Sequence, residues 1–151
     1  MSDQQRFSFA TTSFDHLKVY KDLEEAGKWV DMGAPNKDGT VPQALVIYCG
    51  NRNLKYQKAQ EEAARAIRQG HLADSATLEE NYKVGLSVFA HNGVRNWRNV
   101  QDPEGNEIPF SADAFLAWCN LFPKGVPILE EVAFDGKKFR PEANLEAAAK
   151  K

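Results

Sequence analysis

The residues able to bind a metal are few in this chain and lie far apart. The three histidines are His16, His71 and His91, and none stands three or four positions from another histidine or a cysteine. Neither an HExxH nor a CxxC element occurs, whereas a zinc site needs ligands at such spacings. The sequence therefore predicts no metal site.

Patterns for nucleophilic or phosphate chemistry are missing as well. The glycines of residues 33–39 precede no Lys-Ser or Lys-Thr pair, and no GxSxG element occurs. Adjacent carboxylates such as Glu61–Glu62 and Glu130–Glu131 fall on expected helices, where they indicate solvated faces rather than a catalytic pair. We therefore expect no catalytic residue, no cofactor and no enzymatic activity.

The two cysteines, Cys49 and Cys119, are far apart in the sequence. Because a free cysteine behaves as a small apolar residue, we expect two buried, reduced thiols. A disulfide between them is the alternative, although nothing in the sequence implies secretion.

Charge argues against nucleic acid as a partner. The formal net charge is −2 and the pI is near 5.9. Residues 51–70 are basic all the same, and Arg95, Trp97 and Arg98 could stack a base. Since the whole chain is slightly acidic, we expect no nucleic-acid binding and favour an acidic protein partner for the basic helix.

Nothing in the sequence predicts a membrane protein. The longest apolar runs, such as Ala44–Cys49, are far shorter than the ~20 residues that span a bilayer. The N-terminus lacks the apolar segment of a signal peptide. We expect a soluble, intracellular protein.

The elements that would carry these residues are mostly helical. We expect a mainly α fold, a small helical domain of three to five helices with an N-terminal β-hairpin near 28–49. The segment 28–32 would pair with 44–49, and either Phe7–Phe9 or another subunit would supply a third strand. Expected helices cover 14–26, 51–69, 77–92, 111–122 and 127–134. Residues 1–140 would form one domain, and 141–151 a flexible tail.

Apolar spacing predicts which helix faces are buried. Leu78, Tyr82, Leu86 and Phe89 form one expected core stripe. The helix that Ser111 caps would turn inward the residues Ala114, Phe115, Trp118 and Leu121/Phe122. Val94 and Trp97, three residues apart, would lie on a last irregular turn after the preceding helix.

Two motifs in this order resemble the tail assembly chaperones of long-tailed, siphovirus-like bacteriophages. The first is N-x-x-Y at a helix start, here Asn53 and Tyr56. The second is W-x-x-V-x-D-x-x-G-x-x-x-x-F-S, here Trp97, Val100, Asp102, Gly105, Phe110 and Ser111. The resemblance covers roughly residues 15–132, and the second motif is the more specific. Asn96 and Arg98 depart from the acidic or glycine residues usual beside the tryptophan.

The resemblance implies a non-enzymatic protein of tail morphogenesis. Such chaperones bind the tape measure protein, help to recruit tail tube subunits in the host cell cytoplasm, and are absent from the mature virion. The alternative is a structural virion component, such as a small head–tail connector or tail-associated protein. The hairpin's open edges make self-association into a ring or spiral a further expectation.

A groove for an amphipathic helix would need small and aromatic walls. Two regions of the sequence offer them: the stripe on the 51–69 helix and the region of the two later tryptophans. The predicted partner-binding residues are Tyr56, Ala59, Ala63, Ile67, Trp97 and Trp118. Both tryptophans also suit a core position, because each can bury on the order of 200 Å².

Overall fold

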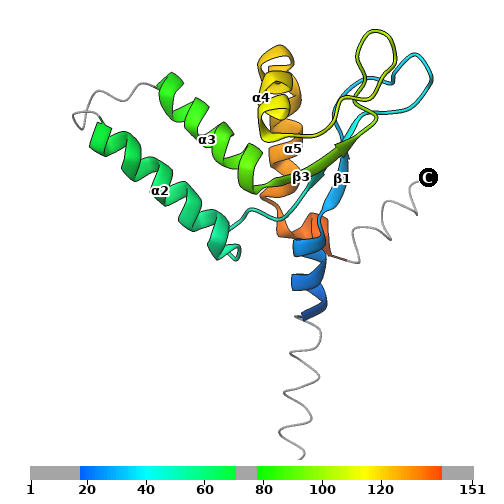
Figure 1. The fold of residues 1–151 in the computed structure, drawn as a ribbon. Coiled ribbons are helices and arrows are strands. Elements are labelled where there is room, and N and C mark those ends of the chain that lie inside the picture. Colours follow the sequence, from blue (N-terminus) through cyan, green and yellow to red (C-terminus); the bar gives the residue numbers. More distant parts are fainter. Residues whose placement is uncertain (1–17, 71–77, 141–151) are drawn as a thin grey trace, which may run out of the picture.

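The computed structural model describes residues 18–70 and 78–140. Helices dominate these residues, and a small sheet lies beside them (Figure 1). After a helix at residues 18–26, the elements run in this order: β1 (Lys28–Asp31), β2 (Gln43–Val46), α2 (Leu54–Gly70), α3 (Leu78–Asn92), β3 (Val94–Arg98), α4 (Ala112–Leu121), the 3-10 turn η1 (Pro123–Gly125), α5 (Val126–Ala133) and the 3-10 turn η2 (Gly136–Phe139). The expected class, mainly α with a β-hairpin near the N-terminus, is confirmed.

Within the described residues the sheet has three antiparallel strands in the order β1-β2-β3. The hairpin of β1 and β2 was expected, whereas the third strand was expected from Phe7–Phe9 or another subunit and not from residues 94–98. Residues 94–98 form β3, so the expected irregular turn at Val94 and Trp97 is wrong. The segment Phe7–Phe9 lies outside the described residues.

A bulge explains why this strand was missed. Ala44 pairs with Trp97 and Leu45 with Asn96, but Val46 pairs with Val94, so Arg95 is the extra residue. One extra residue brings two positions that are three apart onto the same face of a strand. Val94 and Trp97 are therefore both buried, although their spacing resembles that of a helix.

The two faces of the sheet differ in polarity. Ala44, Val46 and Trp97 lie buried on the face that meets the helices. On the outer face Arg98 Nε donates to Gln43 Oε1 (2.8 Å), and Gln43 Nε2 donates to Asp31 Oδ1 (2.8 Å). The Arg98 guanidinium also lies 4.1 Å from the centre of the Trp29 ring. The sheet is therefore amphipathic, with its apolar side turned to the core.

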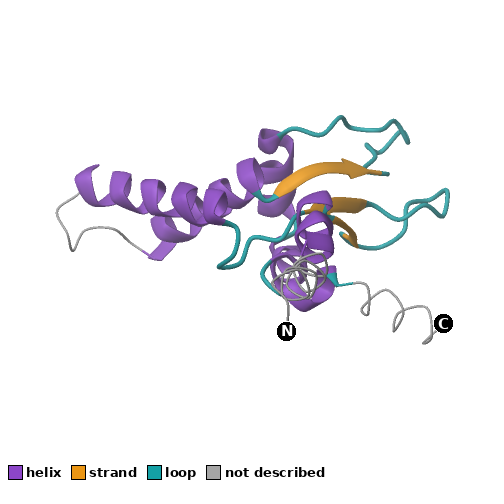
Figure 2. Cartoon of the chain, turned by 90° about the horizontal axis from the view of Figure 1, so that it is seen from below, coloured by secondary structure: helices purple, strands orange, loops and turns teal. Residues whose placement is uncertain are grey.

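Helices α2 and α3 lie side by side and project away from the strands (Figures 1 and 2). The small residues of α2 face the neighbouring helix: Ala63 and Ile67 line one shallow hollow together with Val84 and Val88 of α3. Small side chains let two helices approach closely. The helix that approaches α2 here is α3 of the same chain.

The core stripe expected on α3 is only half correct. Leu86 and Phe89 are buried, but Leu78 is 89% and Tyr82 is 52% exposed. The two outer residues lie on the projecting half of α3, beyond the reach of α4 and the sheet (Figure 1). Helical spacing predicts a common face, and the length of the neighbouring element decides how much of that face is covered.

Candidate functional site

The most informative surface begins inside the core, as a series of aromatic rings. The Phe89 ring meets Phe115 at a centroid distance of 6.0 Å, and Phe115 stacks on Trp118 at 5.8 Å. Trp118 in turn lies 6.2 Å from Phe122. Phe89 and Phe115 are buried, Trp118 is half-buried, and Phe122 is 58% exposed. One apolar face of α4 therefore runs without interruption from the core to solvent.

Local sequence chemistry positions this helix. Ser111 caps α4, since its Oγ accepts a hydrogen bond from the Ala114 backbone N–H at 3.0 Å. Residues 115, 118 and 122 then share a face through steps of three and four. At the other end, the Phe122 N–H donates to the Trp118 carbonyl, and Pro123 begins η1.

A glycine lets the Trp118 ring lie flat on the next turn. A Cβ placed on Gly125 would stand 2.6 Å from Cη2 of Trp118, closer than real contacts allow. Gly125 is itself buried, so the ring covers it. Trp118 is thus held between η1 and the Phe115 ring, with its outer part exposed.

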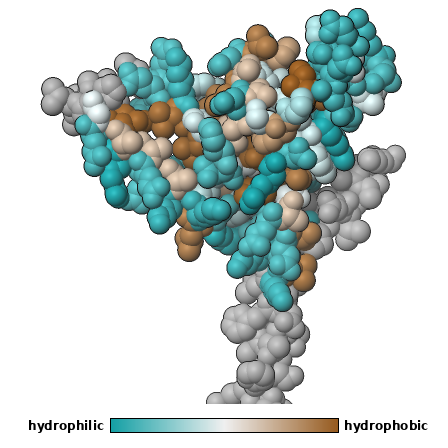
Figure 3. Space-filling view, in the orientation of Figure 1, coloured by the Kyte–Doolittle hydropathy of each residue, from teal (hydrophilic) through white to brown (hydrophobic). Residues whose placement is uncertain are grey.

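Three large apolar residues are exposed where α4 ends and α5 begins, including Phe122 at the outer end of this ring series. Leu121 is 74% exposed, Phe122 58% and Ile128 54%. They lie at the end of α4 and the start of α5, where Figure 3 shows brown, apolar residues at the top of the view. We call Trp118, Leu121, Phe122 and Ile128 the apolar cluster. The expectation that Leu121 and Phe122 face the core is wrong, because nothing among the described residues packs over the end of α4.

Four of the other predicted partner-binding residues lie on α2, away from the apolar cluster. Tyr56 is buried and meets the edge of the Phe134 ring at 5.7 Å. Ala59, Ala63 and Ile67 are half-buried on α2. The structure does not bring these four residues together with either tryptophan in one surface.

Trp97 belongs to the core as well. It is buried, its Nε1–H donates to the Ile108 carbonyl at 2.7 Å, and its ring meets Phe110 edge-on at 5.6 Å. The hydrogen bond satisfies the indole donor that burial would otherwise leave without a partner. Of the six predicted residues, Trp118 alone belongs to the apolar cluster at the end of α4.

Ile128 belongs to the apolar cluster but was not among the partner-binding residues predicted from the sequence. Spacing alone gives no signal for it, because adjacent apolar residues of a helix can both be buried, as Val88 and Phe89 are in α3. The structure buries Leu129 and leaves Ile128 outside.

In residues 18–70 and 78–140, no group of three or more histidine, cysteine or acidic side chains could hold a metal ion. In the same residues, no helix is both long and apolar enough to cross a membrane.

Both cysteines are free and buried, as expected for reduced thiols. Burial raises the pKa of the Cys49 and Cys119 thiols to about 12. We predict that neither reacts with a disulfide reagent at pH 8 in the folded protein, since only about one thiol in 10⁴ is then ionised. Both should react in urea, where the pKa returns to about 8.5. Fast labelling of either thiol in the folded chain would contradict this burial.

The same shift has a consequence for stability. Because the folded-state pKa is raised, the thiols favour folding below about pH 8.5, and this contribution is lost as the pH rises toward 12.

The comparisons with known proteins add one match. A family model described as YdaY prophage protein matches residues 50–151, which include α2, α3, β3, α4 and α5. Comparison with curated proteins and with solved structures found no match. The family match covers well over half of the chain and contains the apolar cluster. The chain therefore belongs to the family of YdaY prophage proteins.

Proposed function

We propose that this prophage protein is a tail assembly chaperone, which binds the tape measure protein and helps to recruit tail tube subunits. It would act by binding rather than by catalysis, in the host cell cytoplasm, and would not enter the mature virion. The prophage family supplies the phage context. The motif around Trp97 and Phe110 supports the finer assignment through its resemblance to these chaperones.

The observation that carries the proposal is the apolar cluster. A tape measure protein is a long helix whose apolar stripes aggregate when they are left bare. Each large apolar side chain that such a helix covers contributes roughly 1.5–3 kcal/mol. Leu121, Phe122 and Ile128 offer that surface around the half-buried Trp118 ring, which suits an amphipathic helix lying in a groove or on a face.

The sheet edges suit self-association into a ring or spiral. In the described residues β1 and β3 are the outer strands of the sheet, and each pairs with β2 alone. An outer strand has backbone groups free on one side, which can pair with another copy.

Co-expression tests the proposal. The chain is produced in the same cells as the tape measure protein of its prophage, and the soluble fraction of the latter is measured by immunoblot. We expect more soluble tape measure protein than with an unrelated protein of equal size, and co-purification of the two chains. Unchanged solubility without co-purification would contradict the proposal. Abundance of the chain in purified virions, measured by mass spectrometry, would favour a structural component instead.

A further inference from the structure

A second surface lies at the opposite end of the molecule from the apolar cluster (Figure 1). It is a groove of about 820 Å³ between the helix at 18–26, the segment that joins β2 to α2, and the end of α3. Three tyrosines contribute to its lining: Tyr20 is half-buried, whereas Tyr48 and Tyr56 are buried beneath the groove. Five cationic side chains also line the groove. The cations are Lys21, Arg52, Lys55, Arg95 and Arg140.

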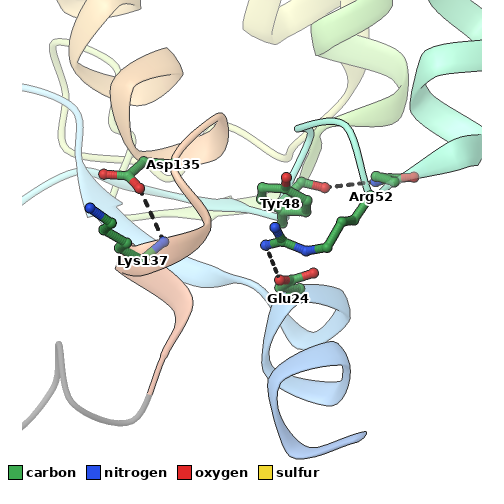
Figure 4. A network of polar contacts seen from close by, with 6 residues as sticks. Glu24, Tyr48, Arg52, Asp135 and Lys137 are labelled. Carbon is green, nitrogen blue, oxygen red and sulfur yellow. Dashed lines mark hydrogen bonds and ion pairs between the residues drawn. The ribbon is translucent and has the colours of Figure 1, made fainter. Parts of the chain in front are cut away.

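Arg52 is held in place at this groove, although its side chain is 58% exposed. Its Nη2 lies 2.5 Å from Oε1 of Glu24, whose side chain is only 12% exposed. Its guanidinium carbon stands 4.5 Å from the centre of the Tyr48 ring (Figure 4). The hydrogen bond with Glu24 raises the pKa of Arg52. An arginine held on both sides is already ordered, so less side-chain entropy is lost when a partner arrives.

The backbone around Tyr48 is shaped to hold this arrangement. A Cβ on Gly50 would stand 2.2 Å from the Tyr48 hydroxyl, so only glycine leaves room for the ring. Asn53 donates from Nδ2 to the Tyr48 carbonyl at 2.7 Å, and its Oδ1 accepts from the Tyr56 N–H at 3.0 Å. The start of α2 and the tyrosine are therefore fixed together.

Charge in the groove is unbalanced. The groove has two carboxylates, and Glu24 pairs with Arg52 while Glu25 lies 3.9 Å from Lys21. The side chains of Lys55 and Arg95 make no hydrogen bond or ion pair with any of the described residues. The five cations thus exceed the two carboxylates by 5 − 2 = 3 charges, in a chain whose net charge is −2.

The bulge in β3 gives Arg95 its place in this surface. Arg95 is the unpaired extra residue of the strand and lines the groove, while its neighbours on either side pair with β2. Bulges re-aim a side chain out of the regular alternation of a strand.

We propose that this groove binds an acidic peptide segment of a partner protein, with its carboxylates at Lys55 and Arg95 and its apolar side chains against the half-buried Tyr20. A protein partner is favoured over nucleic acid because the chain has a net charge of −2, whereas nucleic-acid-binding domains usually carry an excess of positive charge. The inference does not depend on what covers the apolar cluster.

The test uses the full chain and a fluorescein-labelled peptide of alternating glutamate and tyrosine, with binding followed by fluorescence anisotropy at low salt. The groove variant is Lys55→Ala with Arg95→Ala. Its matched control is Arg65→Ala with Lys83→Ala, which removes the same charge from exposed positions on α2 and α3 outside the groove. Circular dichroism verifies that both variants keep the fold.

We expect the groove variant to bind the peptide about tenfold more weakly, and the control to stay within about twofold of the unmodified chain. A peptide with glutamine in place of glutamate should bind far more weakly than the acidic one. Equal losses in both variants, equal binding of the glutamine peptide, or no binding at all would overturn the proposal. Tighter binding of a single-stranded oligonucleotide of equal charge would assign the groove to nucleic acid instead.

Discussion

The Phe115→Ala variant is expected to lose about 3–5 kcal/mol of unfolding free energy. Phe115 is fully buried, and its ring contacts both Phe89 and Trp118. Truncation removes the transfer free energy of the ring, leaves a cavity, and breaks two aromatic contacts at once. The free energy of unfolding of a domain is typically about 5–15 kcal/mol, so the substitution would remove a large share of it. Denaturation in urea, followed by tryptophan fluorescence, measures the loss.

Leu121→Ala is the matched control on the same helix. Leu121 is exposed, so its truncation should change the unfolding free energy by no more than about 0.5 kcal/mol. Similar losses in both variants would mean that the outer end of α4 is covered in solution, and the apolar cluster would not be a free surface.

The second large effect concerns partner binding. The double variant Leu121→Asp with Phe122→Asp should keep the fold but lose co-purification with the tape measure protein. Both residues are largely exposed, so folding barely needs them, whereas an apolar partner would meet two unpaired charges. Central interface residues typically contribute 2 kcal/mol or more each, so affinity should fall by at least about 30-fold.

Leu78→Asp with Tyr82→Asp provides a control of equal chemistry. These residues are also exposed and apolar, but they lie on the projecting half of α3 and not on α4. This control should retain the tape measure protein. If it loses the partner while the α4 variant keeps it, the binding surface belongs on α3.

Local rules predicted much of this fold from the sequence. Ser111 caps α4 as expected, the hairpin forms between β1 and β2, and α5 begins beside Pro127. These features depend on residues that are close in the sequence, where capping, turn and spacing preferences act directly.

The parts that were not predicted depend on contacts between distant segments. The bulge at Arg95 arises from pairing with β2, which lies some fifty residues earlier, so no local sequence pattern predicts the bulge. The groove joins the helix at 18–26 to Arg52, Arg95 and Arg140. The exposure of Leu121 depends on whether another element covers the end of α4, and helical spacing does not predict such coverage.

Site-specific photo-crosslinking reports whether the apolar cluster contacts the tape measure protein, as we propose. A photoreactive phenylalanine analogue replaces Leu121 in one variant and the exposed Glu79 of α3 in another, and cells producing both proteins are irradiated. We predict a covalent adduct with the tape measure protein from position 121 and none from position 79. An adduct from position 79 alone, or from neither position despite co-purification, would contradict the proposal.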